Sequence, residues 1–237
     1  MMSMSAPIWL IAHREACSSS ITKEPVGLYA DHIFPRLMDR VMRTPRFQEQ
    51  RQQALAPVSG RVLEIGFGTG LNLPHYPSTV TWLTAIEPGH LLDKRVAERS
   101  ANLAMPVEIF RYRAEALPWE DHRFDCAVST WTLCTIRDPL QALSEIRRVL
   151  KPDGKFIFLE HGRSDDPKIA RWQTILNPFQ RVFACGCNLN RRIDRLIEEG
   201  GFAVERMDRF VMDGLPRPGA DMYRGVASPK PNFCPMP

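Results

Sequence analysis

A chain of 237 residues is long enough to bury one large core, and its 44% hydrophobic and 24% charged residues are typical of an ordinary soluble globular protein. Its formal charge of +4 comes from Lys and Arg residues spread along the sequence without a dense run. Nucleic-acid binding is therefore not indicated.

The six cysteines are too few and too irregularly spaced for a disulfide framework, which favours a reducing, cytoplasmic location. "CGC" at 185–187 lacks a second Cys or His pair, so no metal site is expected. The apolar stretch "APIWLIA" near the N-terminus is too short to span a bilayer. The sequence thus predicts no integral membrane segment, and any membrane contact would be peripheral.

The chain divides into a loosely ordered leader (1–27), one domain (28–228) and a short tail (229–237). Residues 29–54 have helical spacing interrupted by Pro35 and Pro45, which predicts two short helices. With apolar residues such as Met38 and Met42, they are expected to cover a pocket.

Strand-like and helical segments then alternate. Strands are expected at 61–66, 80–87, 107–112, 124–130 and 155–161, and roughly at 202–211 and 222–227. Helices are expected just after Gly70, over 91–101, over 140–150 and in "NRRIDRLIEEGGF". This alternation builds a parallel sheet. The fold class is therefore α/β: a single doubly wound, mostly parallel seven-stranded sheet with an N-terminal helical addition.

A glycine-rich turn, "GFGTG", follows the first expected strand. In such sheets ligands bind beyond the carboxyl ends of the strands, and glycines let a ligand lie against bare backbone. A dinucleotide site has the spacing G-x-G-x-x-G, whereas here the third glycine comes one residue early and position 71 is Leu. Glu64 would repel a diphosphate and could hold an ammonium group, while Glu87 ends the second strand, where a carboxylate can bind ribose. A nucleoside ligand without a diphosphate is favoured.

Several motifs in this order resemble one family. "VLEIGFGTG", "AEALPW", "FDCAVSTWTLCTI" and "ALSEIRRVLKPDGKFIFLEH" resemble the class I S-adenosylmethionine-dependent methyltransferases, whose fold is Rossmann-like. "GTGLNLPHYP", "TLC", "LEH" and "GCNLNR" are similar to the thiol S-methyltransferases of the methyltransferase-like-seven group and their bacterial relatives.

The resemblance implies S-adenosyl-L-methionine as cofactor and a set of binding residues. The methionine part would lie against the glycine turn, and Glu87 would bind the ribose. Arg113 replaces the usual Asp before the Ala-Glu pair, so backbone at Ala114 carries the adenine contact. The implied cofactor-binding residues are Glu64, Gly66, Gly68, Gly70, Asn72, Glu87, Pro88, Ala114, Glu115, Ser129, Thr130 and Trp131.

The acceptor is expected to be a small molecule, and the resemblance favours a thiol. A quinone-like or lipid acceptor methylated on carbon or oxygen is the alternative; a nicotinamide-dependent oxidoreductase and a non-catalytic binding module are less favoured. A thiol has a pKa near ~8.5 and must lose its proton, which a base of pKa near ~6.5 can take. His161, at the carboxyl end of the fifth strand, is the candidate for that catalytic base.

Overall fold

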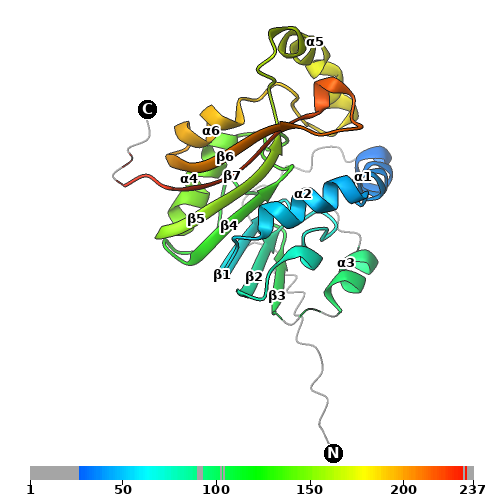
Figure 1. Ribbon diagram of the computed structural model, residues 1–237. Coiled ribbons are helices and arrows are strands. Elements are labelled where there is room, and N and C mark those ends of the chain that lie inside the picture. Colours follow the sequence, from blue (N-terminus) through cyan, green and yellow to red (C-terminus); the bar gives the residue numbers. More distant parts are fainter. Residues whose placement is uncertain (1–26, 90–92, 102, 104, 232, 234–237) are drawn as a thin grey trace, which may run out of the picture.

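The structure, a computed structural model, describes residues 27–89, 93–101, 103, 105–231 and 233. Seven strands form one sheet in the order β3-β2-β1-β4-β5-β7-β6, in which β7 runs antiparallel to both of its neighbours (Figure 1). The strands are β1 (Gly60–Ile65), β2 (Val80–Ile86), β3 (Val107–Phe110), β4 (Phe124–Thr130), β5 (Leu150–His161), β6 (Phe202–Val211) and β7 (Asp221–Pro229). The predicted seven-stranded, mostly parallel α/β fold is confirmed.

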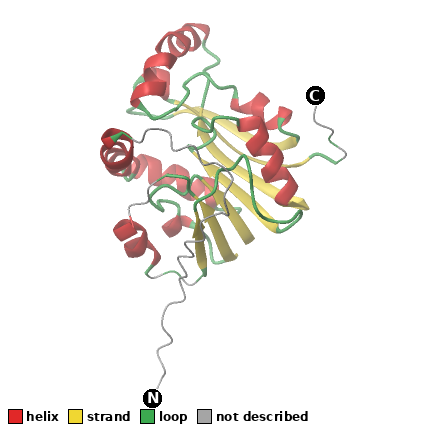
Figure 2. Ribbon diagram, turned by 180° about the vertical axis from the view of Figure 1, so that it is seen from behind, coloured by secondary structure: helices red, strands yellow, loops and turns green. Residues whose placement is uncertain are grey.

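Helices cover both faces of this sheet (Figure 2). Leu55 of α2 (Pro45–Leu55) and Val96 of α3 (Asp93–Ser100) pack on one face. Ile146 of α4 (Pro139–Val149) and Ile197 of α6 (Ile193–Glu199) pack on the other. Strands covered on both sides need apolar residues on both sides, which explains why β1 and β4 read as continuous apolar runs.

The structure differs from the sequence prediction at two helices. The helix after Gly70 is only a single 3-10 turn, Leu73–His75. A long helix that the sequence analysis missed, α5 (Pro167–Phe183), contains Pro178 in its interior. Proline normally interrupts a helix, which hides the helical spacing of the apolar residues around it.

The N-terminal addition consists of a π-helical turn (Tyr29–Ile33), α1 (Phe34–Met42) and α2. Pro35 and Pro45 both lie in the first turns of their helices, where a missing N–H costs nothing. The Tyr29 hydroxyl donates to the carbonyl of Phe183 at 2.8 Å, so this addition contacts the end of α5. The residues before 27 lie outside the described part of the chain.

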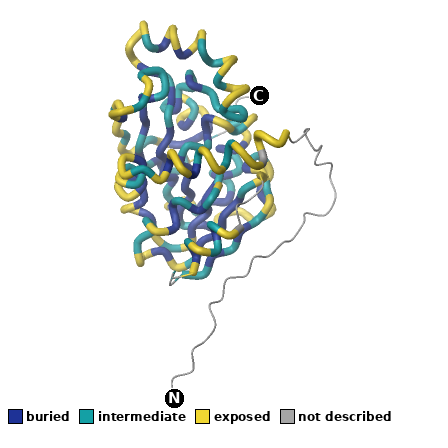
Figure 3. Tube along the Cα trace, turned by 90° about the vertical axis from the view of Figure 1, so that its right-hand side faces the viewer, coloured by how far each residue is buried: buried dark blue, intermediate teal, exposed yellow. Residues whose placement is uncertain are grey.

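Much of α5 and of the N-terminal helices is exposed (Figure 3). Several of the exposed residues are large and apolar. On α5 they are Trp172, Ile175, Phe179, Val182 and Phe183, and on the N-terminal helices Leu28, Tyr29, Ile33, Leu37 and Val41. Within the described residues, none of the helices has the length and apolar character needed to cross a bilayer.

Candidate functional site

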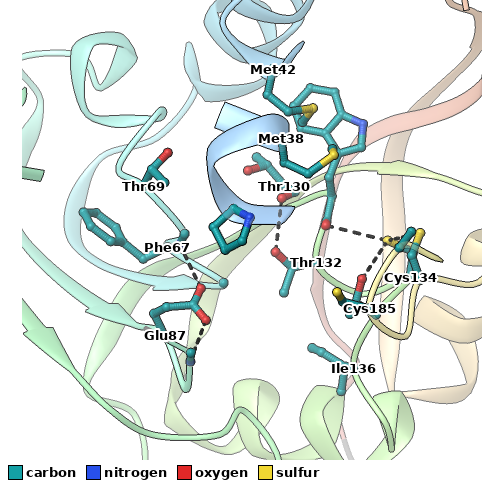
Figure 4. A pocket seen from close by; sticks show the side chains of 18 of the residues that line it. Met38, Met42, Phe67, Thr69, Glu87, Thr130, Thr132, Cys134, Ile136 and Cys185 are labelled. Carbon is teal, nitrogen blue, oxygen red and sulfur yellow. Dashed lines mark hydrogen bonds between the residues drawn. The ribbon is translucent and has the colours of Figure 1, made fainter. Parts of the chain in front are cut away.

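A cavity of about 660 Å³ opens at the carboxyl ends of β1 and β4, beneath α1 (Figure 4). The chain reverses its strand order between β1 and β4, and this is the place where open α/β sheets bind ligands. The cavity is lined by the following predicted site residues: Glu64, Gly66, Gly68, Asn72, Glu87, Pro88, Ala114, Glu115, Thr130, Trp131 and His161.

The glycines of the turn serve different purposes. A Cβ at Gly68 would meet no atom within 4 Å, so this backbone faces open space in the cavity wall. A Cβ at Gly66 would instead collide with the side chain of Thr132, at 2.1 Å. Gly70 is outside the cavity lining, and its φ of +76° allows the turn to close over Phe67 and Leu73. Gly68 is therefore the glycine that could lie directly against a ligand.

Glu87 follows β2, and its carboxylate lies beside the glycine turn in the wall of the cavity. Its Oε2 accepts a hydrogen bond from the Gly68 amide at 2.8 Å, and its Oε1 accepts one from the Gly89 amide at 2.9 Å (Figure 4). Burial raises the pKa of Glu87, and these two amides partly oppose that rise. Each carboxylate oxygen keeps a second lone pair that could accept a hydroxyl, so the carboxylate is placed to bind a diol.

Glu64 is the centre of a buried polar network. It accepts hydrogen bonds from Asn72 Nδ2 and from the Tyr76 hydroxyl, both at 2.8 Å. Burial raises the pKa of Glu64 to about 7, against the opposing effect of these two donors and the charge of Arg51. Asn72 also donates to Thr130 Oγ1 at 3.0 Å, which joins the ends of β1 and β4.

Arg51 was not predicted as a site residue. Its Nη1 donates to Asn72 Oδ1 at 2.6 Å, and its guanidinium lies 4.7 Å from the ring centroid of Trp131. Burial lowers the pKa of Arg51 to about 10, and its Nε is a buried donor with no partner among the described residues. The helix α2 gave no signal for this role, because Arg on a polar helix is typical of a solvated face.

The loop after β4 is held by a second buried carboxylate. Glu160 Oε1 accepts from the Ser129 hydroxyl at 2.6 Å and from the amides of Thr132 and Leu133, both at 3.1 Å. Ser129 is completely buried and is outside the cavity lining, since its hydroxyl turns to Glu160. Trp131, in this loop, has a φ of +50°. Its ring lines the cavity and packs edge to face against the ring of Phe47.

A third part of the wall follows β2 and β3. Pro88 and Ala114 line the cavity there, with Tyr112 and Ile136, which the sequence analysis did not single out. Glu115 lies at the rim, where its carboxylate is 3.7 Å from Arg113. Tyr112 and Ile136 make this part of the cavity wall largely apolar.

Sulfur atoms and an imidazole form the far wall of the same cavity. Cys134, Cys185, Cys187 and His161 all line it, and Figure 4 shows Cys134 and Cys185 on the side away from Glu87. His161 Nε2 lies 2.8 Å from Cys187 Sγ. Burial lowers the pKa of His161, but the contact with Cys187 and the charge of Glu160 outweigh burial, so the net pKa lies above the ordinary value.

The cap helix α1 is tied to the glycine turn through Asp39, which is buried. Asp39 accepts from the Thr69 hydroxyl at 2.6 Å and from Arg99 at 2.8 Å, and it also pairs with Arg95. Burial would raise the pKa of Asp39, but these hydrogen bonds and charges hold it below its usual value. The prediction that Met38 and Met42 lie over the pocket agrees with their place in its lining.

Comparisons with known proteins place the chain in a family. Residues 63–158 match the model of a methyltransferase domain. A phosphatidylethanolamine N-methyltransferase of Cereibacter sphaeroides is 32% identical over 158 residues, which cover 66% of this chain and 76% of that protein. This chain belongs to the class I S-adenosylmethionine-dependent methyltransferases.

Two further comparisons show how far the likeness reaches. The thiol S-methyltransferase TMT1B of Rattus norvegicus is 30% identical over 151 residues, and the match spans 62% of each chain. Among solved structures, the [4+2]-cyclase SpnF has a TM-score of 0.60 at 19% identity and covers 78% of this chain and 80% of its own. The latter likeness concerns the fold alone, so the reaction must be argued from the site.

The site fits the methyl donor of this methyltransferase family. Glu87 is placed for the ribose hydroxyls, and Gly68 offers bare backbone. Arg51 and Glu64 line the polar end of the cavity, where they offer a positive charge to a carboxylate and a negative charge to an ammonium group. These residues would hold S-adenosylmethionine, which would supply an activated methyl group in the cavity.

Proposed function

We propose that this methyltransferase acts on a small-molecule thiol and produces a methyl thioether. The observation that carries the proposal is that one cavity joins the cofactor residues to a wall of Cys134, His161 and Cys187. Bound S-adenosylmethionine supplies a methyl group already activated by its positive sulfur. The protein's contribution is to orient the two partners and exclude water, which can supply a large share of the rate.

The chain's own residues divide this work. Gly68 and Glu87 fix the donor on one side, and the cap helix α1 with Met38 covers the cavity against water. On the other side, His161 is the titratable imidazole nearest the acceptor's expected place. The assignment of His161 as the group that handles the acceptor's proton stays a prediction. His161→Ala is expected to lower thiol methylation about 100-fold or more while cofactor affinity is unchanged, as measured by initial rates and by calorimetry.

A quinone-like or lipid acceptor is the second candidate. The cavity lining includes Phe34, Met38, Met42 and Met222, and the exposed apolar helices flank the cap. A surface of that kind suits a lipophilic acceptor, and the C. sphaeroides relative is named for a lipid substrate. The thiol proposal is supported instead by the sulfur and imidazole groups inside the cavity and by the likeness to TMT1B.

The deciding experiment measures release of S-adenosylhomocysteine with a panel of acceptors. The panel holds a small alkyl thiol, its S-methyl thioether as a matched control, a reduced quinone and vesicles containing phosphatidylethanolamine. We expect turnover with the thiol and none with the thioether. Turnover with the quinol or the vesicles and none with the thiol would overturn the proposal. The Gly68→Val variant controls for release that does not depend on the cofactor site.

A further inference from the structure

Two cysteines and a histidine meet on the acceptor side of the cavity. Cys134 follows β4, His161 ends β5, and Cys187 follows α5, so three separate segments contribute. One ligand atom from each, the two sulfurs and an imidazole nitrogen, lie within 4.8 Å of one another. The two sulfurs are 3.7 Å apart, and His161 Nε2 is 2.8 Å from Cys187 Sγ.

The backbone around this cluster is fixed by hydrogen bonds. Asn188 donates to the carbonyl of Cys134 twice, from its backbone amide and from Nδ2, both at 2.9 Å. Gly186, with a φ of +97°, turns the chain so that Cys187 faces back toward Cys134. Arg191 donates to the carbonyls of Leu133 and Ile136 and holds the same loop from the other side. The three side chains are therefore brought together by a built arrangement of loops.

The His161 ring is not fully hydrogen-bonded within the described part of the protein. Its Nε2 contacts the Cys187 sulfur, and its Nδ1 is buried without a hydrogen-bond partner among the described residues. A buried histidine that serves only the fold normally has its ring nitrogens paired. A metal shared by Nε2 and the two sulfurs would explain the contact of Nε2, while Nδ1 would still have no partner among the described residues.

We propose that Cys134, His161 and Cys187 bind one zinc ion, whose fourth position faces the cavity and takes the sulfur of the acceptor thiol. Two thiolates and an imidazole are ligands that zinc prefers, and three protein ligands with one open position are typical of catalytic zinc. With Zn–S bonds of about 2.3 Å, tetrahedral geometry sets the sulfurs about 3.8 Å apart, close to the observed 3.7 Å. The same geometry sets the imidazole nitrogen about 3.5 Å from each sulfur, so on binding zinc the His161 ring would move back from its 2.8 Å contact with Cys187. The role of the fourth position rests on the proposed thiol methylation, whereas the metal site does not.

The chemistry balances without a redox partner. On binding to zinc, the acceptor loses its S–H proton to solvent and becomes a thiolate. A lone pair on that sulfur forms the new S–CH₃ bond, while the bond between the methyl and the donor sulfonium breaks and leaves its electron pair on the donor sulfur. The neutral thioether product is a weaker ligand than a thiolate and leaves the metal.

The charge around the cluster suits this role. Zinc with two cysteine thiolates is neutral, and a third thiolate would make the centre negative. The positive charge of Arg191 lies close enough to Cys134 and Cys187 to interact with both. In this arrangement His161 holds the metal and does not take the acceptor's proton. The zinc proposal is thus an alternative to a catalytic base at His161, and it departs from the expectation that the chain holds no metal.

The first test measures the metal. The full chain is purified under reducing conditions, depleted with a chelator and titrated with zinc or cobalt(II). We expect one ion per chain and, with cobalt, the absorption of a tetrahedral centre with thiolate ligands. Cys134→Ser, Cys187→Ser and His161→Ala should each weaken zinc about 100-fold or more, because even outer-shell changes cost about 10- to 100-fold. Cys126→Ala, a buried cysteine of β4 outside the cavity, is the control expected to bind as wild type. No stoichiometric ion in the wild type, or equal affinity in the ligand variants, would overturn the site.

The second test separates this inference from the proposed function. Adding the alkyl thiol to the cobalt-loaded chain should change its spectrum, and adding the S-methyl thioether should not. The role of the metal would be overturned if the thiol left the cobalt spectrum unchanged, or if the zinc-free chain methylated the thiol at the full rate. Neither result would contradict thiol methylation itself. A spectrum that responds to the thiol without turnover by the zinc-loaded chain would overturn the proposed function instead.

Discussion

Replacing Glu87 by Gln tests the cofactor site at its best defined contact. Two backbone amides converge on the two carboxylate oxygens, from Gly68 at 2.8 Å and from Gly89 at 2.9 Å. A glutamine has one acceptor oxygen, so one amide would face an NH₂ group and the negative charge would be lost. A hydrogen bond to a charged group contributes roughly 1.5–3 kcal/mol, which corresponds to about a 10- to 150-fold loss of affinity for S-adenosylhomocysteine.

Calorimetric titration and thermal unfolding should be run together on wild type, Glu87→Gln and Glu120→Gln. Glu120 is a matched control, because it is an exposed glutamate whose partner is Arg123 on the surface. We expect weaker binding for Glu87→Gln alone, with a folded protein. Unchanged affinity would refute the assignment of Glu87 to the ribose, and a lower melting temperature with unchanged affinity would show that Glu87 only holds the turn.

Three further predictions concern the glycine turn and the groups around it. Gly68→Val, which fills the open cavity wall and strains a φ of +57°, should weaken cofactor binding at least about tenfold in calorimetry; equal affinity in a folded variant would refute the contact. Glu64 has a pKa of about 7, so cofactor binding that favours its ionised form should release a proton below pH 7. The affinity should then become stronger as the pH rises to 8. Calorimetric titrations in buffers of different ionisation enthalpy measure the proton release, and a pH-independent affinity would contradict it. Asp39→Asn should lower the free energy of unfolding by about 3 kcal/mol, as for a buried pair that loses one partner. The pKa of Asp39 is lowered in the folded state, so its contribution to the free energy of unfolding is present above the ordinary carboxyl pKa and is lost as pH falls through the folded value. The free energies of unfolding of wild type and variant should therefore converge in acid. A difference between them in urea unfolding that stays constant down to the lowest pH would contradict this.

Local patterns predicted most of the fold. The strands β1, β2 and β4 are long apolar runs between turn residues, and such runs are visible in a single sequence. The glycine turn and Glu87 could be found for the same reason, because each is defined by its position relative to a strand. The helix α5 was missed because Pro178 stands in its interior.

The rest of the site depends on contacts between distant segments. Arg51 reaches Asn72 and Thr130 from the polar middle of α2, "QEQRQQ", so nothing local distinguishes it from a surface residue. His161 and Cys187 are 26 positions apart, and their contact follows only from the path of α5. β4 and β5 are neighbours in the sheet, which brings Cys134 and His161 together, but the sequence analysis assigned no strand order.

The bond between Asp39 and Thr69 joins residues 30 positions apart, one in the cap helix α1 and the other in the glycine turn. Neither segment can swing away without exposing the same buried carboxylate. Local opening of a protein occurs in cooperative units, and the cap and the turn are expected to form one such unit. Their backbone amides should then exchange with solvent at a common rate, and a bound nucleoside should slow both segments together.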